Sequence, residues 1–281
     1  MKTSLWTLLF LAACVSATIA QNRERTDPAP VPSDLRSIDT GLSVRGMYGF
    51  GRMIHKDAVG AFADHRIIEG HLAFRNTQWV YTADSAIIPG LRLSSLFYGS
   101  RTTPLDGDGI SSESSRFGAR SAGGYGWANQ AGMILPYSSS SIVWTKLDLD
   151  PLLLDSADRG IFADFDDATR FGTAIEAGVE VISSNGFSAG LGVERNMVFP
   201  RHLVFKEIVA SIIQSGIAEL AGSVIVKFSN SKIAGPIAAF IVSNGVRFAI
   251  SELRRKEMNW PFTSSPPLVF DAFTIGVAYT F

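Results

Sequence analysis

The clearest pattern in the chain is the alternation of large apolar and small residues over its last positions, 270–281. Large apolar side chains stand at every second position, namely Phe273, Ile275, Val277, Tyr279 and Phe281. Small or polar residues fill the positions between, namely Ala272, Thr274, Gly276, Ala278 and Thr280. A period of two places successive side chains on opposite faces of a β-strand. The pattern therefore predicts a final strand with one apolar face and one small, polar face.

A second alternating segment, residues 173–194, contains Ser-Asn-Gly at 184–186 and is predicted to form a β-hairpin. Asn-Gly between two alternating runs is the strongest short-range signal for such a turn. One face is apolar, while the other mixes small residues with Glu176, Glu180 and Glu194. Carboxylates are costly in a sealed apolar core unless they are paired, but they are ordinary on a face toward a wet lumen. We therefore predict that these glutamates, with Arg195 nearby, line a lumen; ion pairing across a barrel is the alternative interpretation.

Further alternating segments predict strands at 41–50, 72–82, 91–99 and 141–147, and one bent strand or two at 117–135. Polar loops are predicted at 102–116 and 148–170. The second loop is rich in aspartate, and Asp164, Asp166 and Asp167 form a candidate cation-binding loop. A solvated surface is the simpler interpretation of these carboxylates. Interleaved Phe162 and Phe165 leave open that the loop packs as a plug or lid.

Residues 203–258 fit two interpretations. Helical spacing is present at 203–215 and 244–258, whereas 217–228 alternates as a strand does. We therefore expect strands interrupted by a helical insertion somewhere in 203–258. Uninterrupted apolar runs here are shorter than the roughly 18 residues that mark a membrane helix.

The N-terminal segment indicates export. Lys2 precedes an apolar run at 5–11 and small residues up to Ala20, which predicts a signal peptide at 1–20. Three alternating prolines predict an extended periplasmic leader at 21–40, with the barrel at 41–281. The only cysteine, Cys14, lies inside the signal, so the mature chain has no disulfide. Leu-Ala-Ala-Cys at 11–14 resembles the lipobox of bacterial lipoproteins, so acylation at Cys14 stays open.

Composition narrows the class of protein. The 281 residues are 46% hydrophobic and 18% charged, with 26 glycines, which suits strands and turns better than a helical bundle. The net charge of -1 provides no basic field for nucleic acid. Aromatic residues stand near the ends of the predicted strands, as an interfacial girdle requires. They are Tyr48, Trp79, Tyr81, Trp127, Trp144 and Tyr279.

The chain end itself resembles the C-terminal signature of Gram-negative outer-membrane β-barrels, with a final Phe281, an aromatic Tyr279 and alternate apolar residues before it. This resemblance covers about a dozen residues and indicates a class of proteins without singling out a family. It implies a location in the outer membrane, in contact with its lipid. It also implies that the barrel-assembly machinery reads Phe281 and Tyr279 as an assembly signal.

We therefore predict an all-β fold, an antiparallel transmembrane β-barrel of roughly 10–12 strands at about 10 residues per strand plus loops. Its predicted function is a passive channel or transporter for small-molecule solutes, or a structural surface protein. A secreted β-sandwich binding module is an alternative, because its strands also alternate.

The other alternative is an outer-membrane lipid-modifying enzyme, and catalysis is the less favoured interpretation. Asp64 beside His65, and His202 with Glu207 and Ser211, show no recognised catalytic spacing. No metal or cofactor site is predicted: the Asp-Gly-Asp-Gly run at 106–109 lacks the ligand positions of an EF-hand loop.

Overall fold

The computed structural model describes residues 40–60, 62–81, 87–103, 110–129, 131–149, 156–200, 225, 231, 233–256, 258 and 265–281. The predictions for the signal peptide, for nearly all of the leader and for Cys14 lie outside these residues. The described strands are β1 (Thr40–Ile54), β2 (His65–Tyr81), β3 (Ile87–Thr102), β4 (Ser112–Tyr125), β5 (Trp127–Asn129), β6 (Gly132–Leu149), β7 (Ala168–Ser183), β8 (Phe187–Val198) and β9 (Leu268–Thr280). The described helices are α2 (Ser156–Phe162) and α4 (Ala234–Lys256).

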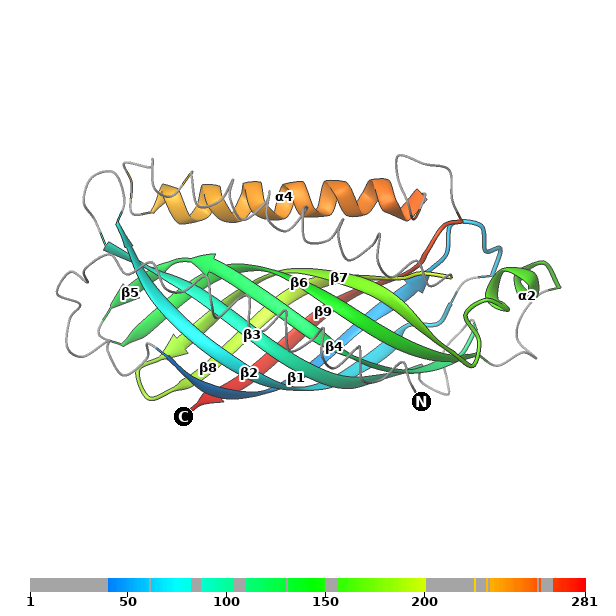
Figure 1. The fold of residues 1–281 in the computed structure, drawn as a ribbon, viewed down its shortest axis with the longest axis horizontal. Helices are drawn as coiled ribbons and strands as arrows, with labels where there is room; N and C mark the ends of the chain where they lie inside the picture. Colours follow the sequence, from blue (N-terminus) through cyan, green and yellow to red (C-terminus); the bar gives the residue numbers. More distant parts are fainter. Residues whose placement is uncertain are drawn as a thin grey trace, which may run out of the picture.

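Eight of these strands close into an antiparallel barrel (Figure 1). The strand order is β4-β3-β2-β1-β9-β8-β7-β6, and β4 pairs with β6 to complete the circle. The short β5 pairs with β6 beside the barrel. The barrel prediction is confirmed, and the single closed sheet overturns the alternative of a β-sandwich.

The predicted number of roughly 10–12 strands is wrong for two physical reasons. The strands are longer than the assumed ten residues, reaching 18 residues in β6 and 17 in β2. In addition, the connection from β8 to β9 contains the helix α4 where further strands were expected. Both features account for residues of the chain without adding strands to the barrel.

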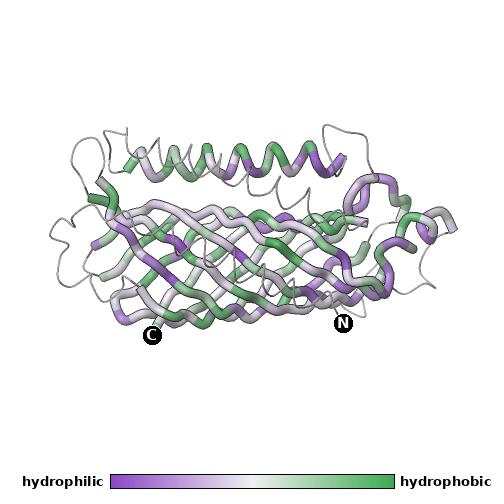
Figure 2. The backbone as a smooth tube through the Cα atoms, in the orientation of Figure 1, coloured by the Kyte–Doolittle hydropathy of each residue, from purple (hydrophilic) through white to green (hydrophobic). Residues whose placement is uncertain are grey.

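The alternation predicted for the last strand and the hairpin is confirmed (Figure 2). In β9, Ile275 and Val277 are 51% and 64% exposed on the outer face, whereas Thr274 and Ala278 are buried inside. The hairpin turn lies where Asn-Gly predicts it, and Gly186 has φ of 88°, in the left-handed region that favours glycine. Large apolar side chains therefore point outward, and small or polar ones point inward.

The two ends of the barrel differ in their connections. Short connections at 82–86, 126–131 and 184–186 lie at the end that also holds the start of β1 and the end of β9. The strands that are joined by longer connections, at 55–64, 103–111, 150–167 and 199–267, meet at the opposite end, where α2 also lies (Figure 1). We call these the short-turn end and the long-loop end.

The interior is filled in three layers. At the short-turn end, Leu91, Met133, Leu135 and Ile182 form an apolar cluster. Trp79 packs against this cluster. The prediction that Trp79 belongs to an outward girdle is therefore wrong, because its position in β2 points inward.

A polar layer occupies the middle of the barrel interior. At the long-loop end a larger apolar cluster includes Phe162, Phe165 and Phe270. The aspartate-rich loop thus does pack as a lid, formed by α2 and residues 163–165.

The helix α4 lies lengthwise along the outside of the barrel and contacts β4, β6 and β7 (Figure 1). The predicted helix at 244–258 is confirmed, although it begins earlier, at Ala234. The predicted helix at 203–215 and strand at 217–228 lie outside the described residues, apart from Ile225. By length and mean hydropathy, α4 could cross a membrane. A search for uninterrupted apolar runs misses it, because Ser243, Asn244 and Arg247 interrupt the run.

Candidate functional site in the barrel interior

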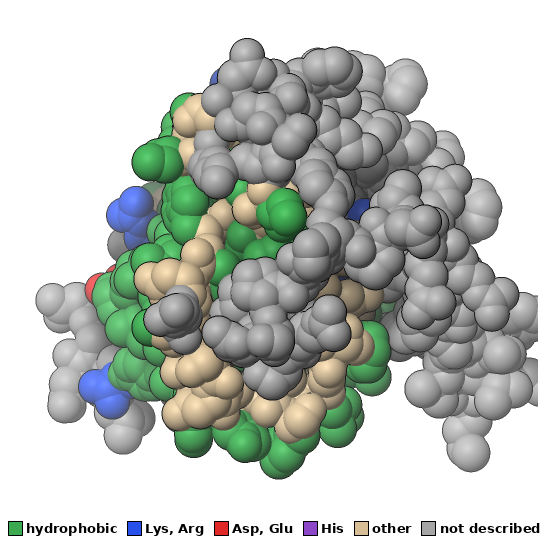
Figure 3. Space-filling model, turned by 90° about the vertical axis from the view of Figure 1, so that its left-hand side faces the viewer, with side chains coloured by type: hydrophobic (Ala, Val, Ile, Leu, Met, Phe, Trp, Pro, Cys, Tyr) green, Lys and Arg blue, Asp and Glu red, His purple; other side chains and the backbone are tan. Residues whose placement is uncertain are grey.

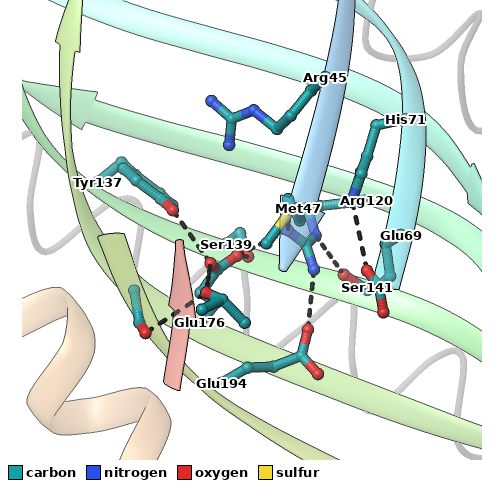
Figure 4. A network of polar contacts seen from close by, with 12 residues as sticks. Arg45, Met47, Glu69, His71, Arg120, Tyr137, Ser139, Ser141, Glu176 and Glu194 are labelled. Carbon is teal, nitrogen blue, oxygen red and sulfur yellow. Dashed lines mark hydrogen bonds and ion pairs between the residues drawn. The ribbon is translucent and has the colours of Figure 1, made fainter. Parts of the chain in front are cut away.

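Glu194 is the centre of the polar layer and accepts hydrogen bonds from Arg101, Arg116 and Arg120. Figure 4 shows the contact with Arg120. Arg116 Nη1 lies 2.6 Å from Glu194 Oε1, and Arg101 Nη2 lies 3.0 Å from the same oxygen. Arg120 Nη2 donates to Oε2 at 2.8 Å. Strands β3 and β8 are four steps apart in the circle of eight, so the Arg101–Glu194 contact crosses the full bore.

A second contact crosses the bore nearer the short-turn end. Arg75 on β2 donates from Nη2 to Glu180 Oε1 on β7 at 2.8 Å, and these strands also face each other across the circle. Arg45 on β1 donates to the other carboxylate oxygen of Glu180. Arg75 also contacts the hydroxyl of Ser188 at 3.1 Å. Glu180 therefore ties three separate strands together.

Glu176 and Glu69 complete the layer. Glu176 accepts from Arg120 at 2.7 Å, from the Tyr137 hydroxyl at 3.1 Å and from the Thr274 hydroxyl at 3.2 Å. Glu69 accepts from Arg116 and lies 3.3 Å from Nε2 of His71. The two glutamates thus connect five strands through charged or hydroxyl groups.

Inward glycines make room for these long side chains. A Cβ at Gly192 would lie 2.5 Å from Oε1 of Glu176, and one at Gly99 would collide with Cγ of Glu69. This close approach explains part of the high glycine content of the strands, because only glycine leaves space beside a charged side chain in a narrow bore.

The side chains of this layer are largely shielded from solvent. Eight of its charged members are buried, and the side chain of a ninth, Arg45, is 11% exposed. The eight are Arg75, Arg101, Arg116, Arg120, Glu69, Glu176, Glu180 and Glu194. Arginine offers planar donors that match a carboxylate with two bonds, which suits it to such pairs. Removal of one partner would leave a buried charge uncompensated. The layer can therefore lock the barrel wall together and obstruct passage along the axis.

Aromatic rings join the polar layer to its surroundings. His71 stacks on Phe97 with ring centroids 5.3 Å apart, and the Arg116 guanidinium lies 5.4 Å from the centroid of the same ring. The Arg101 guanidinium lies 4.4 Å from the centroid of Phe270, which belongs to the apolar cluster under the lid. The charged layer and the long-loop cluster are thus in direct contact.

The structure places Glu176, Glu180 and Glu194 in the interior, where each is paired with arginine. Arg195, predicted to line the lumen with them, lies instead on the outer face, because neighbouring residues of a strand point to opposite faces. Its guanidinium contacts Asp271 at 2.7 Å and Glu252 of α4 at 2.9 Å.

The five interior arginines were not predicted from the sequence. A signal exists, because Arg116 and Arg120 stand at even positions of β4 with Gly118 between them, and Arg75 shares its alternating face with Glu69 and His71. Alternation alone places them on one face. Only strand pairing shows that this face is the one that holds the glutamates.

The candidate cation-binding residues do not come together. Asp167 is exposed and paired with Lys146, with Nζ 2.8 Å from Oδ1, and this ammonium holds the pKa of Asp167 below its usual range. Asp166 accepts a hydrogen bond from the backbone N–H of Leu149 at 3.0 Å. Within the described residues, no group of three or more His, Cys, Asp or Glu side chains could hold a metal ion.

The lid is held down by Asp158 and His55. The buried carboxylate of Asp158 accepts hydrogen bonds from the backbone N–H groups of Val59 at 2.9 Å and Gly60 at 2.8 Å. The ring of His55 meets Phe162 edge-on, with centroids 5.6 Å apart. Loop 55–60 and α2 therefore cover the long-loop end as one packed unit.

The lid is expected to loosen in acid. Burial against the lid lowers the pKa of His55 below its ordinary value, and the opposing effects of Asp57 and Asp158 are smaller. The folded lid therefore favours neutral imidazole: its stability is complete above about pH 6.5 and falls as the pH drops through the folded pKa. Hydrogen exchange of residues 55–60, corrected for intrinsic rates, should rise from pH 8 to pH 5. The same pH dependence in His55→Gln would contradict this assignment.

The residues considered for catalysis are not assembled into a site in the described structure. Asp64 is exposed, whereas His65 is buried inside the barrel with its ring 5.7 Å from that of Phe270. Neighbouring positions in the sequence are thus separated by the barrel wall. His202, Glu207 and Ser211 lie outside the described residues.

Comparisons with known proteins add a resemblance in fold. No protein-family model and no curated protein sequence matches the chain. Among solved structures, the chain is similar to the crystal structure of Neisserial surface protein A (NspA), with a TM-score of 0.41 and 9% sequence identity, over 86% of this chain and 97% of that chain. A similarity at this level supports no statement about function, and the barrel assignment rests on the strand pairing itself.

Proposed function

We propose that this chain is an integral β-barrel of a bacterial outer membrane that serves as a closed structural surface protein and not as an open pore. The observation that carries the proposal is a closed barrel with an apolar outer wall and a bore crossed by buried Arg–Glu pairs. The two halves of this observation, wall and bore, support different parts of the proposal.

The outer wall supports a location in lipid. Its exposed apolar side chains include Tyr48 on β1, Ile68 and Leu72 on β2, Leu191 on β8 and Val277 on β9. Figure 3 looks onto the short-turn end and shows hydrophobic side chains around much of the described rim. A soluble monomer rarely exposes a continuous apolar surface of this kind. In a bilayer the same surface is favourable, and the closed sheet satisfies every strand without an edge.

The bore supports a closed state. A barrel of eight strands leaves an interior just wide enough for side chains to fill. Here the Arg101–Glu194 and Arg75–Glu180 contacts cross that interior, and apolar clusters close both ends. A passive channel for solutes, the other function predicted from the sequence, would require these pairs to separate. The filled interior therefore favours a structural role.

The asymmetry of the connections supports an orientation. Outer-membrane barrels have short periplasmic turns and longer extracellular loops. The short-turn end would then face the periplasm, and the lid with the loops at 55–64 and 103–111 would face outward. The parts presented to the exterior would be the lid and these loops, which is the arrangement of a surface protein.

Expression in a Gram-negative host tests the location. We expect the full chain to fractionate with the outer membrane and to migrate faster in detergent gels before boiling than after it, because a folded barrel resists detergent. A fully soluble periplasmic product with no such shift would overturn the proposal.

Deletion of Phe281 is expected to reduce the assembled fraction severalfold. Phe281 is 74% exposed, its ring lies 4.9 Å from that of Tyr279, and its N–H donates to the Leu42 carbonyl at 2.9 Å. Its ring thus contributes nothing to the interior and is available to the assembly machinery. Phe281→Tyr, which keeps an aromatic end, is the control and should assemble normally. Equal amounts of assembled protein in the deletion and the wild type would contradict an assembly role.

A further inference from the structure

The polarity of α4 is inverted relative to a helix on a water-soluble protein. The side toward the barrel carries small and polar residues, and Ser243, Ser251 and Arg254 are buried there. The side away from the barrel is apolar: Ile237 and Ile241 are 43% and 61% exposed. A helix at a water-facing surface buries its apolar side instead. The inversion indicates that the medium around α4 is less polar than the surface under it.

The barrel wall under α4 is its polar sector. Outward positions that would otherwise be apolar hold Ser138 and Thr173, both buried beneath the helix. Arg247 donates a hydrogen bond to the hydroxyl of Ser140 on the same wall. A cavity of about 200 Å³ between helix and wall is also lined by Ser94 and Ser121. Hydroxyl groups facing acyl chains are costly, so this sector needs the cover that α4 provides.

The length and charges of α4 fit a membrane span. Its 23 residues extend about 34 Å at 1.5 Å per residue, against a hydrocarbon core of about 30 Å. Ala239 packs with Ile88 at the short-turn end, and the Arg254 guanidinium lies 5.1 Å from the centroid of Phe199 at the long-loop end. The helix thus covers the height of the wall. Its charges lie after position 246, where Glu252 pairs with Arg195 near the outer interface.

We propose that the exposed face of α4 contacts the acyl chains of the outer membrane, so that this helix spans the membrane beside the barrel and seals its polar sector from lipid. The proposal rests on the outer-membrane location proposed above. It extends that function, because a helix and a β-barrel would then share one lipid-facing surface. The exposed face of α4 carries large aliphatic side chains, as the exposed wall of the barrel does, which is why we assign lipid as the medium that both surfaces contact.

The accessibility of nitroxide labels in lipid vesicles tests whether acyl chains contact the exposed face of α4. Cys14 is the only cysteine, so single cysteines are introduced by Ile241→Cys, Ser243→Cys, Leu72→Cys and Val59→Cys in a Cys14→Ser chain. Leu72 is the lipid reference on the barrel wall, and Val59, 75% exposed in the outer loop, is the water reference. Oxygen, which enters bilayers, and a water-soluble nickel chelate are the two relaxing agents. Each variant is first checked for heat-modifiable migration.

For each label we compare the relaxation caused by oxygen with that caused by the nickel chelate. We expect this oxygen-to-nickel ratio at Ile241 to equal the ratio at Leu72 and to differ from the ratio at Val59. The label at Ser243 should be shielded from both agents. A Val59-like ratio at Ile241 with a lipid-like ratio at Leu72 would overturn the inference and leave the outer-membrane location intact. A Val59-like ratio at Leu72 as well would overturn both. Spin–spin broadening at Ile241 that disappears on dilution with unlabelled protein would show contact with a second copy, and would also overturn lipid as the occupant.

Discussion

Replacement of Glu194 with alanine is expected to lower the free energy of unfolding of the barrel by about 3–5 kcal/mol, because it leaves three buried arginines without their shared carboxylate. Arg101, Arg116 and Arg120 all converge on this side chain from β3 and β4, within 2.6–3.0 Å. The protein is incubated in vesicles at a series of urea concentrations and then run on a detergent gel without boiling. The fraction that migrates as the folded form gives the urea midpoint, which reports the change in stability.

Two matched variants separate charge pairing from general damage. Glu113→Ala removes a carboxylate from the exposed outer face of β4 and should leave the urea midpoint nearly unchanged. Glu194→Gln keeps the shape and one acceptor, and should lie between the wild type and Glu194→Ala. A Glu194→Ala midpoint equal to that of Glu113→Ala would show that the interior pairs do not stabilise the wall.

Replacement of Leu72 with arginine is expected to destabilise the barrel in vesicles by about 2–4 kcal/mol, the cost of a charge on the lipid face near the midplane. Leu72 lies near the middle of β2 and points outward. The control is Thr102→Arg at the exposed end of β3, where the same charge should cost about 0–1 kcal/mol because it reaches the interface. Equal urea midpoints for the two variants would contradict a lipid-facing wall.

The barrel class could be predicted from the sequence because the period of two is a local property. The alternation is present in β9 and in the β7–β8 hairpin and can be recognised without knowing which strands pair with them. Asn-Gly likewise determines the position of the turn at Gly186. The number of strands could not be predicted in the same way. Strand length depends on pairing along the barrel wall, so β6 continues through Pro136 and through polar positions that look like strand ends.

Only part of the candidate site could be predicted from the sequence, because contacts across the bore also depend on strand pairing. Glu176, Glu180 and Glu194 stand out because carboxylates are unusual within an alternating strand. Arg101 is conspicuous only when closure of the sheet brings β3 opposite β8. Alternation assigns a residue to a face, but contact across the bore is set by strand order and register. The inverted helix α4 is equally hard to recognise, because its polar side has meaning only against the polar sector of the wall.

Electrical recording in planar bilayers tests the closed, lipid-embedded barrel most directly. Folded wild-type protein is added to the membrane, and insertion is verified in the same lipid by protease protection of the barrel strands. We predict protected, inserted protein that produces no stepwise ion conductance, because the Arg–Glu layer and the two apolar clusters fill the bore. Steady, reproducible conductance steps from inserted wild-type protein would contradict the account.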